Sequence, residues 1–279
     1  MKVDLHIHTT FSDGELTPQE VSQRAAAAGL AAFAITDHDE CRGFGTLEKT
    51  DGAIAGIELA AHMNGEVHVL GLDINCGNDT LVAHVQKAAH SRVNRAYEII
   101  ERLNHDGIAV SMDEVKEACG GDVIGRPHIA AVLVKKGFAA TVADAFDRYL
   151  SSRAPYYVPQ KKISVSSAAE LILGAGGKPV LAHPGLLGGT VLGGLVPQLK
   201  EMGFWGVEAY HPAHTDGQCV EYESVARQKK LFVTAGSDFH GSSTPRVGIG
   251  EETRSSSYLQ ESLLILISES EKRSKLHGV

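Results

Sequence analysis

The residues with the clearest chemical potential lie at the start of the chain. His6 and His8 occur in a run over residues 3–8 that alternates apolar and polar positions, and Asp13 follows in a turn. Such alternation is typical of a strand, and residues two apart on a strand leave the same face. Two imidazoles with a carboxylate beyond them indicate half of a metal site. A pair of core histidines beside an N-capping aspartate is the structural alternative.

Later strand-like runs also end in residues that can bind a metal. The runs end at Asp37-His38-Asp39, at Ala182-His183, at His211 and at Ser237-Asp238-Phe239-His240. Independent structural histidines would have no reason to recur at strand ends. The pattern therefore predicts one site at the rim of a barrel, where strand ends converge.

Composition limits the fold and the class of partner. The 279 residues are 43% hydrophobic, enough for one large α/β domain or a domain with an insertion. A net charge of −8 argues against a broad basic surface for nucleic acid but leaves a phosphorylated substrate open. The four cysteines, Cys41, Cys76, Cys119 and Cys219, are scattered, and we see neither a targeting segment nor a membrane-spanning run. We therefore expect a cytoplasmic protein without a membrane or obligate protein partner.

The pattern of elements predicts an α/β fold with one interruption. Strands are expected at 2–7, 32–36, 53–58, 67–70, 178–182, 205–209 and 231–235. Helices are expected between most of them, and a Thr17 capping box starts the first. Between 77 and 160 the pattern turns helical, with helices at 79–106, 112–119, 141–150 and one from Arg126. We therefore expect a barrel from residues 1–76 and 161–279 and a helical, substrate-binding cap from residues 77–160.

The motifs, taken in order, resemble those of a known family. They are His6-Ile7-His8, Ser12-Asp13-Gly14, Thr36-Asp37-His38, Glu58 at a strand end, Ala182-His183-Pro184-Gly185 and Ser237-Asp238-Phe239-His240. This series resembles the PHP (polymerase and histidinol phosphatase) family of the amidohydrolase superfamily. The resemblance implies a distorted (β/α)7 barrel with a helical insertion over the metal site. Gly125-Arg126-Pro127-His128 and Tyr156-Tyr157-Val158-Pro159 resemble the branch of 3′,5′-nucleotide bisphosphate phosphatases and 5′-3′ oligoribonucleases.

The resemblance also implies a set of metal ligands for two to three divalent ions. His6, His8 and Asp238 would hold the first, and Glu58 would bridge to a second held by His183 and His68. Asp13, His38 and His240 would hold the third. Ligands of this mixed histidine and carboxylate type suit Mn²⁺, the favoured ion, or Fe²⁺ or Zn²⁺, better than Mg²⁺ or Ca²⁺.

One ligand position stays open between two histidines. If Asn64-Gly65 forms a two-residue turn, His68 lies opposite Ala61 and alternation places it on the face away from Glu58. A bulge would then be needed to bring His68 to the site. The family pattern favours His68, whereas His62 lies on the Glu58 face and is the competitor.

Two residues near the metal ligands are candidates for catalysis. Hydrolysis of a phosphomonoester needs a proton donor or a third cation beside its poor alkoxide leaving group. His211 ends a strand outside the implied metal set, so it is either that donor or a structural histidine held by the Pro212 turn. Asp37 is expected to orient His38 or the attacking water.

The insertion carries candidates for binding a second, non-reacting phosphate. Arg126 and His128 open a helix after Gly125, where backbone N–H groups also favour an anion. Arg92, on the long insertion helix, is a further candidate, and a solvated helix face is the alternative for each. Lys161 and Lys162 carry the same ambiguity.

The function implied is a metal-dependent phosphatase acting on the 3′-phosphate of nucleoside 3′,5′-bisphosphates. The first alternative is a 5′-3′ exoribonuclease acting on short 5′-phosphorylated RNA. A histidinol-phosphate-type phosphatase or a non-catalytic metal-binding module is less consistent with the insertion and with a full set of ligand positions. The expected partner is thus a small phosphorylated nucleotide or a short RNA oligonucleotide.

Overall fold

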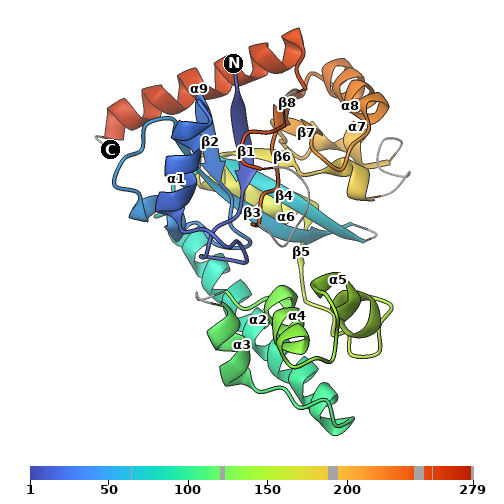
Figure 1. Cartoon of the computed structure of the whole chain (residues 1–279). Helices are drawn as coiled ribbons and strands as arrows, with labels where there is room; N and C mark the ends of the chain where they lie inside the picture. Colours follow the sequence, from blue (N-terminus) through green and yellow to red (C-terminus); the bar gives the residue numbers. More distant parts are fainter. Residues whose placement is uncertain (64, 120–122, 188–193, 242–247, 253, 278–279) are drawn as a thin grey trace.

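The strands form one curved sheet that nearly closes into a barrel, seen in the computed structural model in Figure 1. The structure describes residues 1–63, 65–119, 123–187, 194–241, 248–252 and 254–277. The sheet order is β1 (Val3–Ile7), β2 (Ala32–Ile35), β3 (Ala53–His62), β4 (Glu66–Leu72), β6 (Lys178–Leu181), β7 (Gly206–Tyr210) and β8 (Phe232–Ala235). β4 is antiparallel to both neighbours, and the other pairs along this path are parallel. The expected distorted (β/α)7 barrel with a helical insertion is confirmed.

Backbone hydrogen bonds join the two ends of the sheet. Just beyond β8, the N–H of Asp238 donates to the carbonyl of His6 at 2.9 Å. The N–H of His8 donates to the carbonyl of Phe239 at 2.9 Å. This closure brings the segment after β8 against β1, so ligand-type residues more than 200 positions apart become neighbours.

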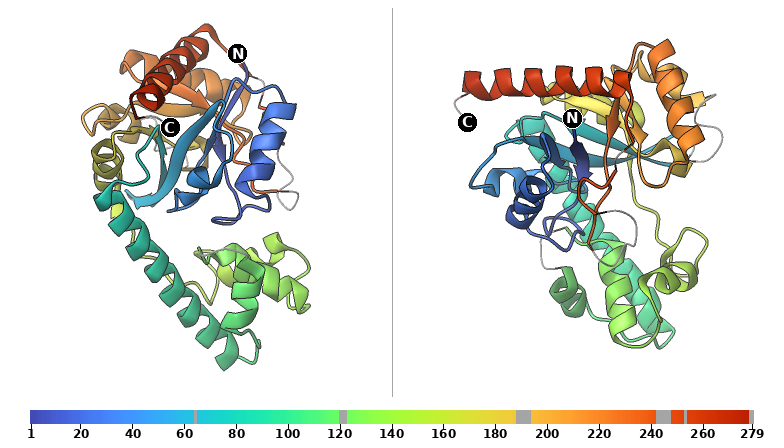
Figure 2. Two further views of the ribbon diagram at one scale, coloured as in Figure 1. Left: turned by 90° about the vertical axis from the view of Figure 1, so that its left-hand side faces the viewer. Right: turned by 45° about the horizontal axis from the view of Figure 1, so that its top comes forward.

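Helices cover the outside of the barrel (Figure 2). They are α1 (Pro18–Ala27), α6 (Val165–Gly174), α7 (Val196–Leu199), α8 (Asp216–Gln228) and α9 (Ser257–His277), with 3₁₀ turns at Arg42–Thr46 and Pro184–Leu187. The Thr17 capping box is present, since Thr17 Oγ1 accepts from the Glu20 N–H and the Glu20 carboxylate accepts from the Thr17 N–H. All five residues of β1 are buried, because its apolar side chains pack outward on helices while its polar ones face the barrel interior.

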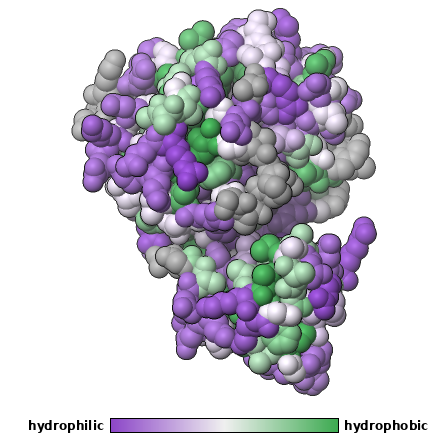
Figure 3. All heavy atoms as spheres, in the orientation of Figure 1, coloured by the Kyte–Doolittle hydropathy of each residue, from purple (hydrophilic) through white to green (hydrophobic). Residues whose placement is uncertain are grey.

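The helical insertion forms a second lobe with its own core. It contains α2 (Asp79–His105), α3 (Met112–Cys119), α4 (Arg126–Lys135), α5 (Val142–Ala145) and a π-helical turn, η2 (Phe146–Leu150). Ile99, Leu103, Val115, Ile129 and Leu150 pack together in a cluster separate from the barrel core. The chain rejoins the barrel at β5 (Ile163–Ser164), which pairs with the end of β3. Hydrophilic residues cover much of the visible face of both lobes, with smaller hydrophobic groups between them (Figure 3).

The hairpin between β3 and β4 differs from the expected one. His62 pairs with Glu66, so three residues, 63–65, connect the strands instead of two. The pairing shifts by one position, and His68 lies opposite Ala60 rather than Ala61. Because Ala60 and Glu58 are two apart on β3, Glu58 and His68 share a face without any bulge. The two-residue turn was therefore wrong, and so was the need for a bulge. The sequence also predicts a glycine-rich loop at residues 185–194, and most of that range lies outside the described residues.

Candidate metal centre

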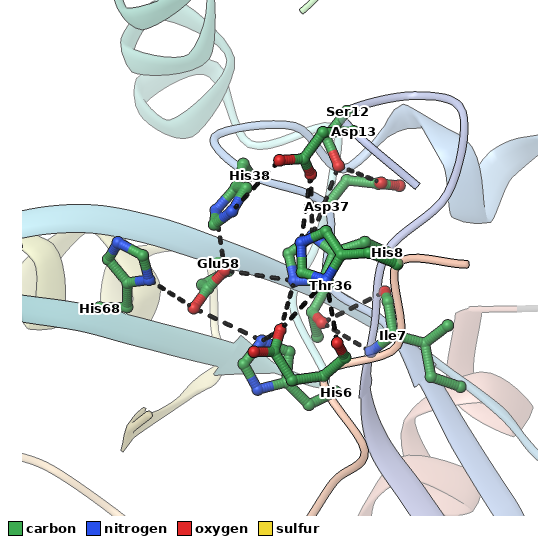
Figure 4. A network of polar contacts seen from close by, with 12 residues as sticks. His6, Ile7, His8, Ser12, Asp13, Thr36, Asp37, His38, Glu58 and His68 are labelled. Carbon is green, nitrogen blue, oxygen red and sulfur yellow. Dashed lines mark hydrogen bonds and ion pairs between the residues drawn. The ribbon is translucent and has the colours of Figure 1, made fainter. Parts of the chain in front are cut away.

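Glu58 lies at the middle of a buried cluster of histidines (Figure 4). Its two carboxylate oxygens are 2.8–3.4 Å from imidazole nitrogens of His6, His8, His38, His68 and His183. Burial alone would raise the pKa of the Glu58 carboxyl, but the charges of the surrounding histidines hold it well below its usual range. An ionised carboxylate with imidazoles on both oxygens can bridge two cations.

Asp238 forms a second point of convergence on the other side of His6 and His8. Its Oδ1 lies 3.4 Å from His6 Nε2 and 3.3 Å from His8 Nε2, and its Oδ2 lies 3.4 Å from His211 Nε2. Burial would raise the pKa of Asp238, whereas the charge of His6 and the contact with His211 hold it well below its usual value. Asp238 has a left-handed backbone, with φ of +53°, and its N–H donates to the carbonyl of His6 on β1.

Asp13 gathers a third group beyond the end of β1. Its oxygens lie 3.4 Å from His240 Nε2, 3.7 Å from His8 Nδ1 and 3.9 Å from His38 Nε2. The side chain is 9% exposed, so its charge is shielded from water. The loop that follows β1 therefore adds a separate carboxylate to a cluster that begins on the strand.

The donor set fits divalent metal ions. Ligand atoms lie within 4.8 Å of one another in four overlapping groups: His6, His8 and Asp238; His6, Glu58 and His183; His38, Glu58 and His68; and His8, Asp13, His38 and His240. All nine ligands implied by the motifs fall within these groups. Buried atoms without a hydrogen bond among the described residues include His6 Nε2, His8 Nε2, Asp13 Oδ1, His38 Nδ1, Glu58 Oε2, His183 Nδ1 and His211 Nε2. Buried polar atoms are normally paired, so a concentration of unpaired ones points to cations that complete them.

His68 rather than His62 faces this cluster. His68 Nδ1 lies 2.8 Å from Glu58 Oε1, and its Nε2 lies 3.2 Å from Glu66 Oε1. Burial would lower the pKa of His68, but the charge of Glu58 raises it to about 10. His62 shares the Glu58 face, as expected, yet it is exposed at the last position of β3.

Glu208 is not among the predicted site residues, yet it supports two of the candidate ligands, His6 and His183. It is fully buried on β7, with Oε1 3.0 Å from His6 Nδ1 and Oε2 accepting the His183 N–H at 2.7 Å. Gly236 leaves room for this pair, since a Cβ there would lie 2.4 Å from His6 Cβ and 2.6 Å from Glu208 Oε1. In the sequence, Glu208 stands out as a charged residue inside the otherwise uncharged strand run at residues 206–210.

The Asp37 carboxylate is engaged by the loop that follows β1. Its oxygens accept hydrogen bonds from the Thr9 N–H at 2.7 Å, the Thr9 hydroxyl at 2.7 Å and the Ser12 hydroxyl at 2.6 Å. Among the described residues these partners, and not His38, occupy both oxygens. Asp37 therefore holds the loop that follows His8. These contacts do not support an orientation of His38, and the predicted role of Asp37 toward the attacking water stays a prediction.

Basic side chains of the cap gather near the barrel. Arg92, Arg95 and Arg126 line one small cavity with Gly125. Arg126 lies over the rings of Phe146 and Tyr157, at 5.5 and 5.7 Å from their centroids. Arg92 Nε and Nη2 both contact Asp39 Oδ2, the former at 3.0 Å. Since Asp39 directly follows His38, Arg92 connects the arginine group to the loop that carries a candidate metal ligand.

One ring nitrogen of His128, in the first turn of α4, is engaged by the backbone at the start of that helix. Its Nδ1 accepts the Gly125 N–H at 2.9 Å, which leaves Nε2 to carry the hydrogen of a neutral ring. Burial lowers the pKa of His128, which favours that neutral form. The imidazole can therefore donate one hydrogen bond to a ligand.

Known proteins resemble this chain over most of its length. A family model described as the PHP domain matches residues 4–157. A 3′,5′-nucleoside bisphosphate phosphatase from Chromobacterium violaceum is 34% identical over 249 residues, which span 85% of this chain and 87% of that protein. The 5′-3′ exoribonuclease Rnm of Escherichia coli is 32% identical over 247 residues, spanning 85% and 84%. The structure of a protein from Bifidobacterium adolescentis, described as a metal-dependent phosphoesterase, aligns with a TM-score of 0.82 and 31% identity, covering 94% of this chain and 95% of that one. Within the described residues, no helix has both the length and the apolar composition to cross a membrane.

Proposed function

This chain belongs to the PHP domain family, and from that premise we propose that it is a metal-dependent phosphatase that removes the 3′-phosphate from nucleoside 3′,5′-bisphosphates. One observation carries the proposal: Arg92 of the cap contacts Asp39, the residue next to His38 in the metal-ligand cluster. A candidate cation site and a group of arginines therefore lie close together. A nucleotide with two phosphates could place one phosphate at the cations and the other at the arginines. The named activity of the Chromobacterium violaceum relative supports the same substrate.

We propose three metal positions in this cluster, most suitably filled by manganese. The first would take His6, His8 and Asp238. The second would take Glu58, His183 and His68, since both imidazoles contact Glu58 Oε1, at 3.1 and 2.8 Å. Asp13, His38 and His240 hold the third. Bound divalent ions supply positive charge for the phosphoryl oxygens and lower the pKa of a water. The nitrogen-rich donor set favours manganese, iron or zinc over magnesium or calcium.

His211 is the proposed proton donor to the leaving sugar oxygen. Its Nδ1 accepts the Ala213 N–H at 3.1 Å, so the neutral ring carries its hydrogen on Nε2. That nitrogen is buried and lies 3.4 Å from Asp238 Oδ2, and it has no hydrogen-bond partner within the described part of the chain. The backbone N–H of Ala213 thus directs the Nε2 hydrogen of the His211 ring into the cluster, where it can hydrogen-bond to the leaving sugar oxygen.

Residues 77–160 are the proposed substrate-binding cap. Arg126 would hold the 5′-phosphate through its guanidinium, and His128 would donate from Nε2. Arg92 would contribute through Nη1, because Asp39 already engages its other nitrogens. Anchoring the unreactive phosphate would place the 3′-phosphate at the cluster.

A 5′-3′ exoribonuclease is the second candidate, favoured by the similarity to the Escherichia coli enzyme. Both reactions need a 5′-phosphate anchor and a reacting 3′-phosphate. They differ in whether that phosphate is terminal or joined to another nucleotide.

A combined measurement of metal content and product release tests these functions. Protein loaded with Mn²⁺ is assayed on adenosine 3′,5′-bisphosphate, adenosine 2′,5′-bisphosphate, AMP and a 5′-phosphorylated dinucleotide. We expect phosphate release to be fastest from the 3′,5′-bisphosphate. Faster release of a mononucleotide from the dinucleotide would favour the exoribonuclease. If the metal-loaded protein releases phosphate from neither bisphosphate, the phosphatase function is excluded.

A further inference from the structure

Two cysteines meet outside the metal centre, where the loop after β2 touches the segment between β4 and α2. Cys41 belongs to the loop that carries His38, and Cys76 lies three residues before α2 begins at Asp79. Cys41 Sγ lies 4.0 Å from the carbonyl oxygen of Cys76, and each thiol shifts the pKa of the other. The other cysteines are buried elsewhere, Cys119 in α3 of the cap and Cys219 in α8.

The two thiols differ in access to solvent and in reactivity. Cys41 is 3% exposed, whereas Cys76 is partly exposed and lines a cavity of about 870 Å³ between the barrel and α9. The interaction between the two thiols lowers the pKa of Cys76 and, together with burial, raises that of Cys41. Cys76 is thus the thiol that a small molecule reaches and the one that ionises first, which are the properties of an attacking cysteine.

We propose that Cys41 and Cys76 are a reversible disulfide site that reacts with small-molecule disulfides such as oxidised glutathione. The Cys76 thiolate attacks one sulfur of the small disulfide, whose S–S bond breaks and releases one small thiolate. The Cys41 sulfur then attacks the Cys76 sulfur of the mixed disulfide and releases the second small thiolate. The Cys41 and Cys76 protons end on the two released thiols. Two protein thiols are oxidised, and one small disulfide is reduced to two thiols.

The bond would tie the metal-ligand loop to the base of the cap. Cys41 follows Asp39 by two positions, and Asp39 already accepts hydrogen bonds from Arg92 of α2. A link to Cys76 would add a covalent tether where α2 leaves the barrel. Exchange of backbone amide hydrogens in the first turn of α2 would therefore slow in the oxidised protein.

Peptide mapping of the folded full-length protein tests this site directly. After incubation with oxidised glutathione, we expect two of the four thiols to be lost and one cross-linked peptide pair to contain residues 41 and 76. Dithiothreitol should restore both thiols. Cys119→Ser should still lose two thiols, while Cys41→Ser should retain glutathione on Cys76 without an internal link.

Specific outcomes would overturn the proposal. The proposal is wrong if the wild-type protein carries glutathione on Cys76 without a link to Cys41. It is also wrong if all four thiols remain after incubation. Because the readout is the wild-type peptide map, it needs neither a folded variant nor phosphatase activity. The peptide map tests the disulfide site, and the phosphate-release assay tests the proposed function. Either result can be negative without affecting the other.

Discussion

The Glu208 carboxylate lies against His6, with Oε1 3.0 Å from His6 Nδ1, and both side chains are fully buried. The other oxygen of Glu208 accepts the backbone N–H of His183 at 2.7 Å. One carboxylate therefore fixes the ring of one candidate ligand and the backbone of another. Nδ1 of His6 is committed to Glu208, so Nε2 is the nitrogen presented to a metal.

Glu208→Gln should weaken metal binding without unfolding the protein. The amide keeps the size of the side chain but removes the negative charge that fixes the His6 ring, and loss of such a support typically costs about 10- to 100-fold in metal affinity. Calorimetric titration with Mn²⁺ measures the change. Glu221→Gln, an exposed residue on α8, is the control and should bind like wild type. Equal affinities for Glu208→Gln and wild type would contradict the proposed support.

His68→Ala should lose a metal ligand, whereas His62→Ala should not. His68 Nδ1 is 2.8 Å from Glu58 Oε1, while His62 is exposed at the end of β3. We expect fewer bound metal ions per chain in His68→Ala, measured by elemental analysis after dialysis, and wild-type content in His62→Ala. The opposite result would return the ligand position to His62.

The β3–β4 hairpin shows why the sequence predicted the strands but not their register. Alternation of apolar residues identified both strands, but the choice between a two-residue and a three-residue connection decides which residues pair. Asn64-Gly65 favoured the shorter connection. Pairing of Val67 with Ala61 and of Val69 with Leu59 instead buries all four side chains. Burial on the core side outweighed the local turn preference.

The candidate ligands were easier to predict than the residues that support them. Histidines at strand ends are conspicuous, and convergence of the strands at one rim brings them together. Glu208 and Asp37 act through hydrogen bonds to residues distant in the chain, such as Glu208 to His6 and Asp37 to Ser12. Such contacts depend on side-chain directions across the barrel, which periodicity alone does not specify.

The metal-free protein should lose stability as the pH rises above about 6.5. The charges of Glu58 and Asp13 raise the pKa values of His68 and His240, despite their burial, from 6.5 to about 10 in the folded protein. A raised folded pKa gives stability that is full below the unfolded value and is lost as the pH rises toward 10. Thermal unfolding of protein stripped with a chelator, from pH 6 to 9, should show a falling midpoint.

Bound metal should remove this dependence, because a coordinated imidazole is already neutral. The midpoint of the Mn²⁺-loaded protein should stay level or rise over the same interval. A metal-free midpoint that rises from pH 6.5 to 9 would contradict the charge state assigned to His68 and His240.

Arg126→Ala should impair only substrates that carry a 5′-phosphate. Hydrogen bonds to a charged group contribute about 1.5–3 kcal/mol, so kcat/KM should fall by roughly 10- to 100-fold for adenosine 3′,5′-bisphosphate. Turnover of adenosine 3′-monophosphate should be little changed. Arg153→Ala, an exposed arginine of the cap, is the control. An equal fall for both substrates would contradict the anchoring role.

Arg92→Met should destabilise the protein as well as any substrate complex. The Arg92 and Asp39 side chains are 11% and 3% exposed, and loss of one partner from a buried ion pair typically costs about 3–5 kcal/mol. Urea denaturation should therefore show a lower free energy of unfolding for Arg92→Met. Asp39→Asn combined with Arg92→Met should recover part of this loss, since the unpaired buried charge is gone. If Arg92 served only the phosphate, Arg92→Met would unfold like wild type and slow only the substrates with a 5′-phosphate. A loss of stability thus identifies Arg92 as the side chain that fastens the cap to the metal-ligand loop.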